Sequence, residues 1–83
     1  MASYEIVVKR SVKKDLRKID KIHVPGILER ISSLADNPRP PGCKKLKATN
    51  VYRVRQGNYR IVYEIFDERL VVLVVAVGSR GSI

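Results

Sequence analysis

The sequence predicts an α+β fold in which two helices cover one face of a largely antiparallel sheet. Three patterns predict it. Apolar residues recur at helical spacing within residues 11–34, they alternate with polar residues within 51–65, and an uninterrupted apolar run spans 70–77. A chain of 83 residues has room for one domain, which we place at 1–83.

The first two elements are expected to be a strand and a helix. Apolar side chains at alternate positions of 4–8 predict a short N-terminal strand. Ser11 stands where a helix N-cap is expected. An apolar stripe at helical spacing follows it, made of Val12, Leu16, Ile19 and His23. The other faces of this helix are mostly basic, so it is expected to be amphipathic.

A second helix is expected from about Pro25, because proline lacks an amide N–H and disfavours helix at the residue before it. Its apolar stripe consists of Ile27, Ile31 and Leu34. Two stripes this close together indicate a helical hairpin. The proline-rich segment 37–42 then ends the second helix as a stiff, exposed connector, for which Leu46 is the expected hydrophobic anchor.

The last third of the chain predicts a three-strand meander. Tyr52 and Val54 are expected on one face of a strand, with Arg53 and Arg55 on the other. A glycine-containing turn at 56–58 leads to a second alternating strand over 59–65. After a turn at 67–69, the apolar run 70–77 predicts a central strand that ends at Gly78.

Charge and composition narrow the class of protein. The chain holds 17 Lys and Arg against 8 Asp and Glu, and residues 37–63 carry seven basic residues with no acidic one. Such a block cannot neutralise itself, so a polyanionic partner is expected rather than a merely solvated basic face. The longest apolar run is too short for a membrane span, which takes roughly 20 residues, and no signal peptide is recognised. We therefore expect a cytoplasmic protein with no membrane partner.

Several kinds of chemistry are excluded. A single cysteine, Cys43, rules out an internal disulfide and a cysteine-based zinc site. A single histidine, His23, rules out a ribonuclease that uses two histidines, and its place on the first helix favours a structural role. The carboxylates are scattered and no phosphate-binding glycine loop is present. We expect no metal ion or other cofactor.

After these exclusions, a group of four arginines remains as the candidate functional site. Arg53 and Arg55 share a strand face, a tight hairpin would bring Arg60 beside them, and Arg80 follows the last strand. Like charges on one patch repel unless an anion binds there, and guanidinium groups clamp phosphate in bidentate fashion. If a neighbouring 2′-OH attacks that phosphate, the arginines stabilise the developing charge without a metal. Arginine is a poor proton acceptor, however.

These motifs resemble the RelE branch of the RelE/ParE toxin superfamily. The matching stretches are 37–40, 45–46, Tyr-Arg-x-Arg at 52–55, Gly-x-Tyr-Arg-x-x-Tyr at 57–63 and Val-Gly-Ser-Arg at 77–80. The resemblance implies a type II toxin that enters the ribosomal A site and cleaves mRNA by 2′-OH attack. Carried over by motif, the catalytic residues are Arg53, Arg55, Arg60 and Arg80.

The resemblance also implies partners. We expect a RelB-like cognate antitoxin, the ribosome with its RNA, mRNA, and operator DNA bound only by the toxin–antitoxin complex. Further basic side chains are expected to contact RNA or the ribosome: Lys44, Lys45, Lys47, Arg39, Lys13, Lys14 and Arg17.

Two positions depart from the family pattern. Members usually carry a tyrosine a few residues after the Gly-x-Arg motif, and residues 81–83 contain none; many have histidine where Ser79 stands. One hypothesis is therefore an attenuated toxin, in which Tyr52, Tyr59 and Tyr63 are expected to pack in the core rather than replace the missing side chain. Two alternatives stay open: a ParE-like inhibitor of DNA gyrase, and a catalytically silent module that binds antitoxin or nucleic acid.

Overall fold

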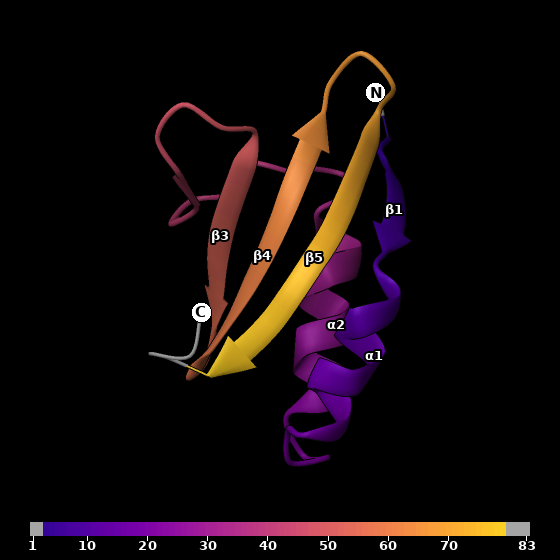
Figure 1. Ribbon diagram of the computed structural model, residues 1–83, viewed down its shortest axis with the longest axis vertical. Helices are drawn as coiled ribbons and strands as arrows, with labels where there is room; N and C mark the ends of the chain where they lie inside the picture. Colours follow the sequence, from indigo (N-terminus) through magenta and orange to yellow (C-terminus); the bar gives the residue numbers. More distant parts are fainter. Residues whose placement is uncertain (1–2, 80–83) are drawn as a thin grey trace.

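The computed structural model describes residues 3–79 as one five-stranded sheet with two helices (Figure 1). In chain order the elements are β1 (Glu5–Val8), α1 (Arg10–Arg17), α2 (Val24–Ser33), β2 (Lys44–Lys45), β3 (Val51–Gln56), β4 (Tyr59–Phe66) and β5 (Val71–Ser79). The strand order is β1-β5-β4-β3-β2. Strand β1 runs parallel to β5, and the other neighbours are antiparallel. The predicted α+β class and three-strand meander are confirmed.

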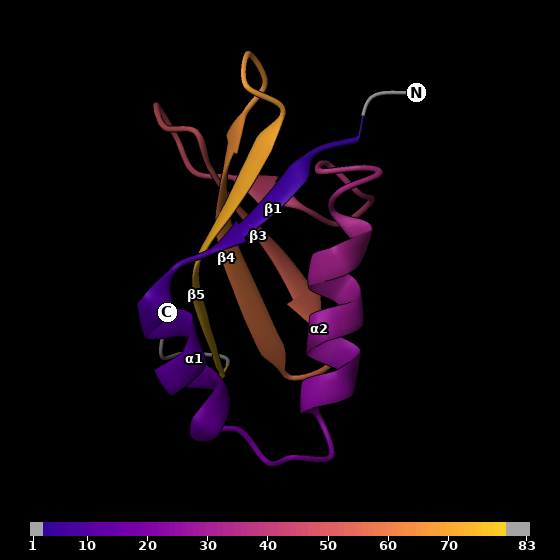
Figure 2. The same ribbon diagram turned by 90° about the vertical axis from the view of Figure 1, so that its right-hand side faces the viewer.

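Both helices lie on one face of the sheet, as the sequence predicts (Figure 2). Helix α1 packs against β5, and α2 packs against β3 and β4. Within residues 3–79, no helix is long and apolar enough to cross a membrane. The opposite face of the sheet carries no helix from the described part of the chain, and this is the face on which the arginines of β3 and β4 stand.

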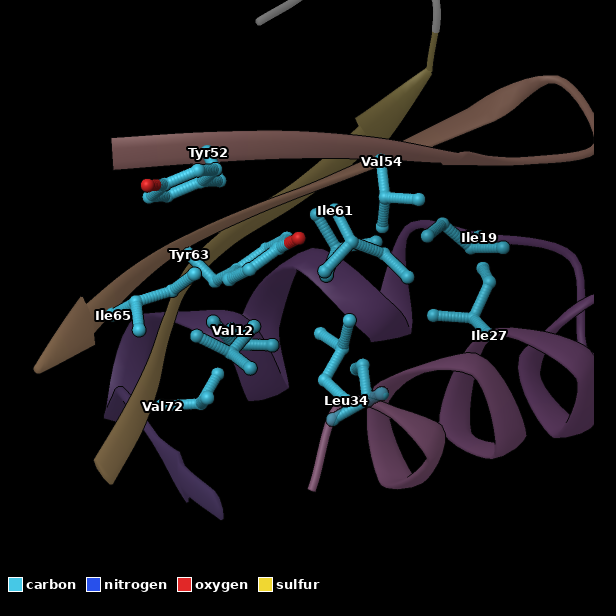
Figure 3. Packing of buried hydrophobic residues seen from close by; sticks show 13 residues of the cluster. Val12, Ile19, Ile27, Leu34, Tyr52, Val54, Ile61, Tyr63, Ile65 and Val72 are labelled. Carbon is cyan, nitrogen blue, oxygen red and sulfur yellow. The ribbon is translucent and has the colours of Figure 1, made fainter. Parts of the chain in front are cut away.

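The core fills the space between the sheet and the helices (Figure 3). Val12, Ile27 and Leu34 come from the helix layer and are completely buried. Alternate residues of β3 and β4 meet them, which confirms the period-two pattern predicted for 51–65: Tyr52, Val54, Ile61, Tyr63 and Ile65. From β5, Val72, Val74 and Val77 complete this layer. Burying side chains of this size supplies roughly 1.5–3 kcal/mol each, so this layer holds the fold together.

The first helix is shorter than its apolar stripe predicts. It begins at Arg10 after an N-cap at Lys9, so Ser11 lies inside it, and it ends at Arg17. The Asp20 side chain accepts a hydrogen bond from the Ile22 amide, a local bond that competes with helix. Ile19 nevertheless reaches the core from the turn, which is why spacing alone could not locate the helix end.

His23 is also placed differently from the prediction. It is the exposed residue just before α2 rather than part of the first helix, and its ring lies 5.3 Å from the ring of Tyr59. The predicted start of the second helix near Pro25 is confirmed, because Pro25 occupies its first turn, where a missing N–H costs nothing.

The connector is only partly exposed, contrary to the prediction. Pro38 and Pro40 are buried, and the Tyr63 hydroxyl donates a 2.7 Å hydrogen bond to the Pro38 carbonyl oxygen. The predicted anchor, Leu46, is wrong, since its side chain stays 44% exposed. The connector instead leads into β2, a short edge strand that pairs with β3 and that the sequence pattern did not indicate.

Candidate functional site

Three arginines gather on the open face of the sheet, around the β3–β4 hairpin. The two-residue turn that joins the strands begins with Gly57, whose φ of 62° is a conformation that glycine adopts without strain. The register pairs Arg55 directly with Arg60, and Arg53 with Val62. Directly paired residues project from the same face, with Cβ atoms roughly 4.5–5.5 Å apart. We call Arg53, Arg55 and Arg60 the arginine cluster.

The environment of the cluster is strongly basic. Arg55 is exposed, whereas Arg53 and Arg60 are half-buried. Neither Arg53 nor Arg55 forms an ion pair with a described residue. The nearest carboxylate in the strand register is Glu64, which lies diagonal to Arg53. Like charges placed opposite one another on a sheet destabilise it, and an anion bound between Arg55 and Arg60 would relieve that repulsion.

A lysine from the connector side extends the cluster. Lys44 of β2 pairs directly with Arg53 of β3. Together with Gly42 and Arg55, these residues line a groove of about 240 Å³. Four side chains with fixed positive charge therefore follow the hairpin in a row across three strands, and such a row suits consecutive phosphates of a nucleic-acid backbone.

Strand β5 ends beside the arginine cluster. Gly78 is paired with Arg60, and Ser79 with Tyr59. Arg80, the fourth predicted catalytic residue, follows Ser79 in sequence and lies outside the described residues, as do 81–83. The register thus confirms that the last strand ends beside Arg60.

Arg39 occupies a different end of the sheet. Its Nη1 and Nη2 atoms donate to the two carboxylate oxygens of Asp67 at 3.1 and 2.8 Å, and its Nε donates to the Tyr52 hydroxyl at 3.1 Å. The Tyr4 hydroxyl donates to Asp67 Oδ1 at 2.7 Å. We call Arg39, Asp67, Tyr4 and Tyr52 the connector clamp. Its hydrogen bonds, first from Arg39 and then from Tyr4, lower the pKa of Asp67 from 3.8 to about 2.

The remaining predicted RNA-binding residues are spread over the surface. Lys45 is exposed in β2 and pairs with Tyr52, and Lys47 is exposed in the loop after it. Three more are exposed on α1, across the sheet from the arginine cluster: Lys13, Lys14 and Arg17. The structure therefore brings Lys44 to the cluster and leaves the other six basic residues apart from it, so their contribution to RNA binding stays a prediction.

The described tyrosines do not join the arginine cluster. Tyr52 and Tyr63 are 8% and 0% exposed and stack on the helix side of the sheet, which confirms their predicted packing. Burial raises the pKa of Tyr63, so its hydroxyl stays protonated. Tyr59 is half-buried on the same side. Among residues 3–79, no three His, Cys, Asp or Glu side chains gather as a metal site. The cluster can bind and polarise a phosphate, and it holds no ready proton acceptor.

Known proteins share this fold and match this sequence. Residues 6–83 match the family model described as the ParE toxin of type II toxin–antitoxin systems, parDE. The chain is 29% identical over 69 residues to the mRNA interferase toxin RelE of Escherichia coli K12, covering 81% of this chain and 73% of that protein.

Solved structures agree with the sequence matches. The RelE–RelB complex of Pyrococcus horikoshii contains a chain with a TM-score of 0.85 and 28% identity, covering 98% of this chain and 99% of that one. A chain of the RelB–RelE complex from Methanococcus jannaschii has a TM-score of 0.73 and 26% sequence identity, with 92% of each chain covered. The family model and these relatives define the class of this chain as the toxin component of a type II toxin–antitoxin system. The chain belongs to the RelE/ParE family of these toxins.

Sequence reasoning missed the partner that fixes Arg39. Asp67 is 28 residues away, beyond the acid-free block 37–63, and nothing local indicates that the β4–β5 turn returns to the connector. The position of Lys44 beside Arg53 is also not evident from the sequence, because the two-residue strand β2 is too short to show a periodic pattern.

Proposed function

We propose that this toxin is a ribosome-dependent endoribonuclease that cleaves mRNA in the ribosomal A site through attack of a 2′-OH on the neighbouring phosphate. The direct pairing of Arg55 with Arg60 on the open sheet face carries this proposal. Two guanidinium groups on adjacent strands match the tetrahedral phosphate and its extra negative charge in the transition state.

The cluster acts by position and charge. Arg60 and Arg55 stabilise the charge that develops on the phosphorus oxygens as the 2′ oxygen attacks. Arg53 and Lys44 hold the adjoining backbone, because their groove continues the row of positive charge. Arg80 follows the strand end paired to Arg60 and is proposed to contact the same phosphate. No metal takes part in these steps.

The partners proposed for this chain follow from the family. A RelB-like antitoxin is supported by the relatives solved as RelE–RelB complexes. The ribosome and its RNA are proposed to supply the remaining contacts, with the free toxin binding no operator DNA unless the antitoxin is present. A site of action on the ribosome places the protein in the cytoplasm.

Primer extension on a translated mRNA with purified ribosomes tests the proposal. Wild-type protein is expected to give ribosome-dependent stops, and Arg60→Ala is expected to remove them. Arg69→Ala is the matched control, since Arg69 lies in the β4–β5 turn over the Phe66 ring, at the other end of the sheet.

Gyrase inhibition is the second candidate, favoured by the match to a family model described by ParE. It predicts no stops on mRNA and a block of DNA supercoiling that survives Arg60→Ala. Cleavage that requires Arg60 and ribosomes contradicts this candidate, whereas supercoiling inhibition without cleavage contradicts the endoribonuclease.

A further inference from the structure

Strand β5 changes its outer neighbour on the way to the arginine cluster. From Val71 to Val74 its outer edge pairs with β1, and the Lys9 amide then donates a 2.9 Å hydrogen bond to the Val74 carbonyl oxygen. Beyond this point the chain of β1 has turned into α1, so no strand of the described residues follows β5 along that edge (Figure 2). The part of β5 that reaches Arg60 therefore has β4 on one edge and α1 on the other.

Asp15 of α1 takes the place of the absent strand. Its Oδ2 atom accepts a 3.2 Å hydrogen bond from the Val77 amide. Val12, three residues earlier on the same helix face, is completely buried, so this face of α1 is held against the sheet. A carboxylate on a packed helix thus pairs a backbone N–H that a strand would otherwise have to meet.

A bulge in β5 precedes this hydrogen bond. The two residues that flank Val75 pair with the neighbouring residues 62 and 63 of β4, so Val75 is one extra residue in β5. A bulge bends its strand and increases the local twist, and bulges next to active sites re-aim side chains. Asp15 binds β5 just after the bulge, so it fixes the direction in which the bent strand continues to Gly78.

Side chains leave space on the helix side of this strand end. A pocket of about 540 Å³ lies there, and Asp15, Tyr59, Gly78 and Ser79 are among the residues that line it. Close packing therefore does not hold α1 against the last residues of β5. The hydrogen bond from the Val77 amide to Asp15 supplies a fixed contact between the two elements at this place.

We propose that Asp15 is a positioning residue for the arginine cluster. By binding the Val77 amide, it holds the end of β5 against α1 and keeps Gly78 paired with Arg60. The residue that follows the described strand is Arg80, so the same hydrogen bond sets where that residue begins. Asp15 lies on the helix side of the sheet and acts through the strand, not by contact with RNA. The inference rests on the proposed function for the reaction that is positioned.

Substitutions separate the hydrogen-bond acceptor from the charge. Asp15→Asn keeps a carbonyl oxygen for the Val77 amide, whereas Asp15→Ala removes every acceptor. Asp15→Leu, which has a similar size and no acceptor, gives the same comparison if Asp15→Ala does not fold. Asp20→Ala is the matched control, since Asp20 also accepts a backbone amide, that of Ile22, in the exposed turn after α1.

The first measurement is single-turnover cleavage of mRNA on ribosomes over a range of protein concentrations. Asp15→Ala is expected to lower the maximal rate by about 10²-fold, the loss that a displacement of roughly 1 Å causes. The half-saturating protein concentration is expected to stay near the wild-type value, because the charges that bind RNA are all retained. Asp15→Asn is expected to restore most of the rate, and Asp20→Ala to leave it unchanged. A loss of overall stability would not produce this separation of rate from binding.

The second measurement needs no ribosome. In the full chain labelled with ¹⁵N, Asp15→Ala is expected to speed hydrogen exchange of the Val77 amide by about tenfold, the effect of one lost hydrogen bond. The amide signals of Gly78 and Arg60 are expected to shift in the same variant, because the end of β5 moves relative to β4. Asp15→Asn and Asp20→Ala are expected to keep both the exchange rate and these signals.

Each outcome decides the matter. An unchanged maximal rate in Asp15→Ala, an equal loss in Asp15→Asn, or a loss confined to the half-saturating concentration overturns the positioning role. If wild-type protein does not cleave mRNA, the proposed function fails, and the amide signals still test Asp15. Unchanged Gly78 and Arg60 signals in Asp15→Ala then overturn its role, whereas shifted signals support it.

Discussion

The two ends of the sheet use arginine in opposite ways. In the connector clamp, Arg39 meets a carboxylate and a tyrosine hydroxyl, and its side chain lies over the Tyr52 ring at 5.2 Å. In the arginine cluster, Arg55 faces Arg60 across two strands. Both ends belong to one acid-free stretch of sequence. At the clamp, Asp67 of the β4–β5 turn supplies an acid, whereas neither Arg53 nor Arg55 forms an ion pair with a described residue.

This difference separates two uses of charge. The clamp ties the connector, the N-terminal segment and the β4–β5 turn together, so it serves the fold. The cluster brings like charges together, which opposes the fold. A count of basic residues would treat the two ends alike. Because Asp67 neutralises Arg39 at the clamp, the charges of Arg53 and Arg55 at the other end are the ones available for a ligand.

The largest expected effect comes from breaking the cluster. Arg60→Ala is expected to lower the single-turnover rate of mRNA cleavage on ribosomes by about 10²–10³-fold, the loss typical of one removed charge-stabilising donor. Arg69→Ala is expected to leave that rate within about twofold, since surface changes of this kind usually alter little. Equal losses in both variants would show that arginine position does not matter.

A change at the clamp end is expected to affect stability instead. Tyr63→Phe removes the hydrogen bond to the buried Pro38 carbonyl oxygen and leaves that acceptor unpaired. Urea unfolding is expected to show a loss of about 1–3 kcal/mol in the free energy of unfolding. Tyr59→Phe, a tyrosine with a half-buried ring, serves as the control and is expected to change it by less than about 0.5 kcal/mol. If Tyr63→Phe lowers the free energy of unfolding by no more than the control does, the hydrogen bond to Pro38 does not stabilise the fold.

Salt dependence sharpens the comparison between individual arginines. Arg55→Gln is expected to reduce the slope of log affinity for single-stranded RNA against log salt by about 0.7, the value for one lost phosphate contact. Arg39→Gln is expected to leave the slope nearly unchanged, because the charge of Arg39 is already balanced by Asp67. Fluorescence titration at several salt concentrations measures both slopes. A larger change of slope in Arg39→Gln than in Arg55→Gln would contradict the conclusion that the cluster, and not the clamp, binds phosphate.

The smallest expected effect is a pH dependence at the clamp. The Asp67 pKa is lowered from 3.8 to about 2, so its ionised form is favoured in the folded state. The resulting stabilisation is complete above about pH 4 and is lost as the pH falls through 2. Urea midpoints of wild type and Asp67→Asn are expected to differ at pH 7 and to converge toward pH 2. A difference that stays constant over this range would show that the charge of Asp67 contributes nothing.

Much of the fold could be read from the sequence because it is local. The alternation around Tyr52 and Tyr63 determines which face each strand buries, and Pro25 determines where the second helix begins. The same alternation placed Arg53 and Arg55 on one face, and the glycine turn placed Arg60 on the facing strand.

Other features depend on contacts between distant segments. The uniform apolar run of β5 hides the register shift opposite Val62 and Tyr63, since every residue in it is equally suited to burial. The parallel pairing of β1 with β5 also cannot be predicted from local sequence, because it joins strands from opposite ends of the chain.

The sequence by itself determined most of the elements, the buried faces of β3 and β4 and the arginines of the hairpin, because each depends on periodicity or turn chemistry within a few residues. The tertiary structure alone decided that Asp67 neutralises Arg39, that Lys44 joins Arg53, and that Asp15 and Tyr59 line one pocket. The physical reason is the same in each case: these side chains meet only after the sheet has closed over segments that are far apart in the chain.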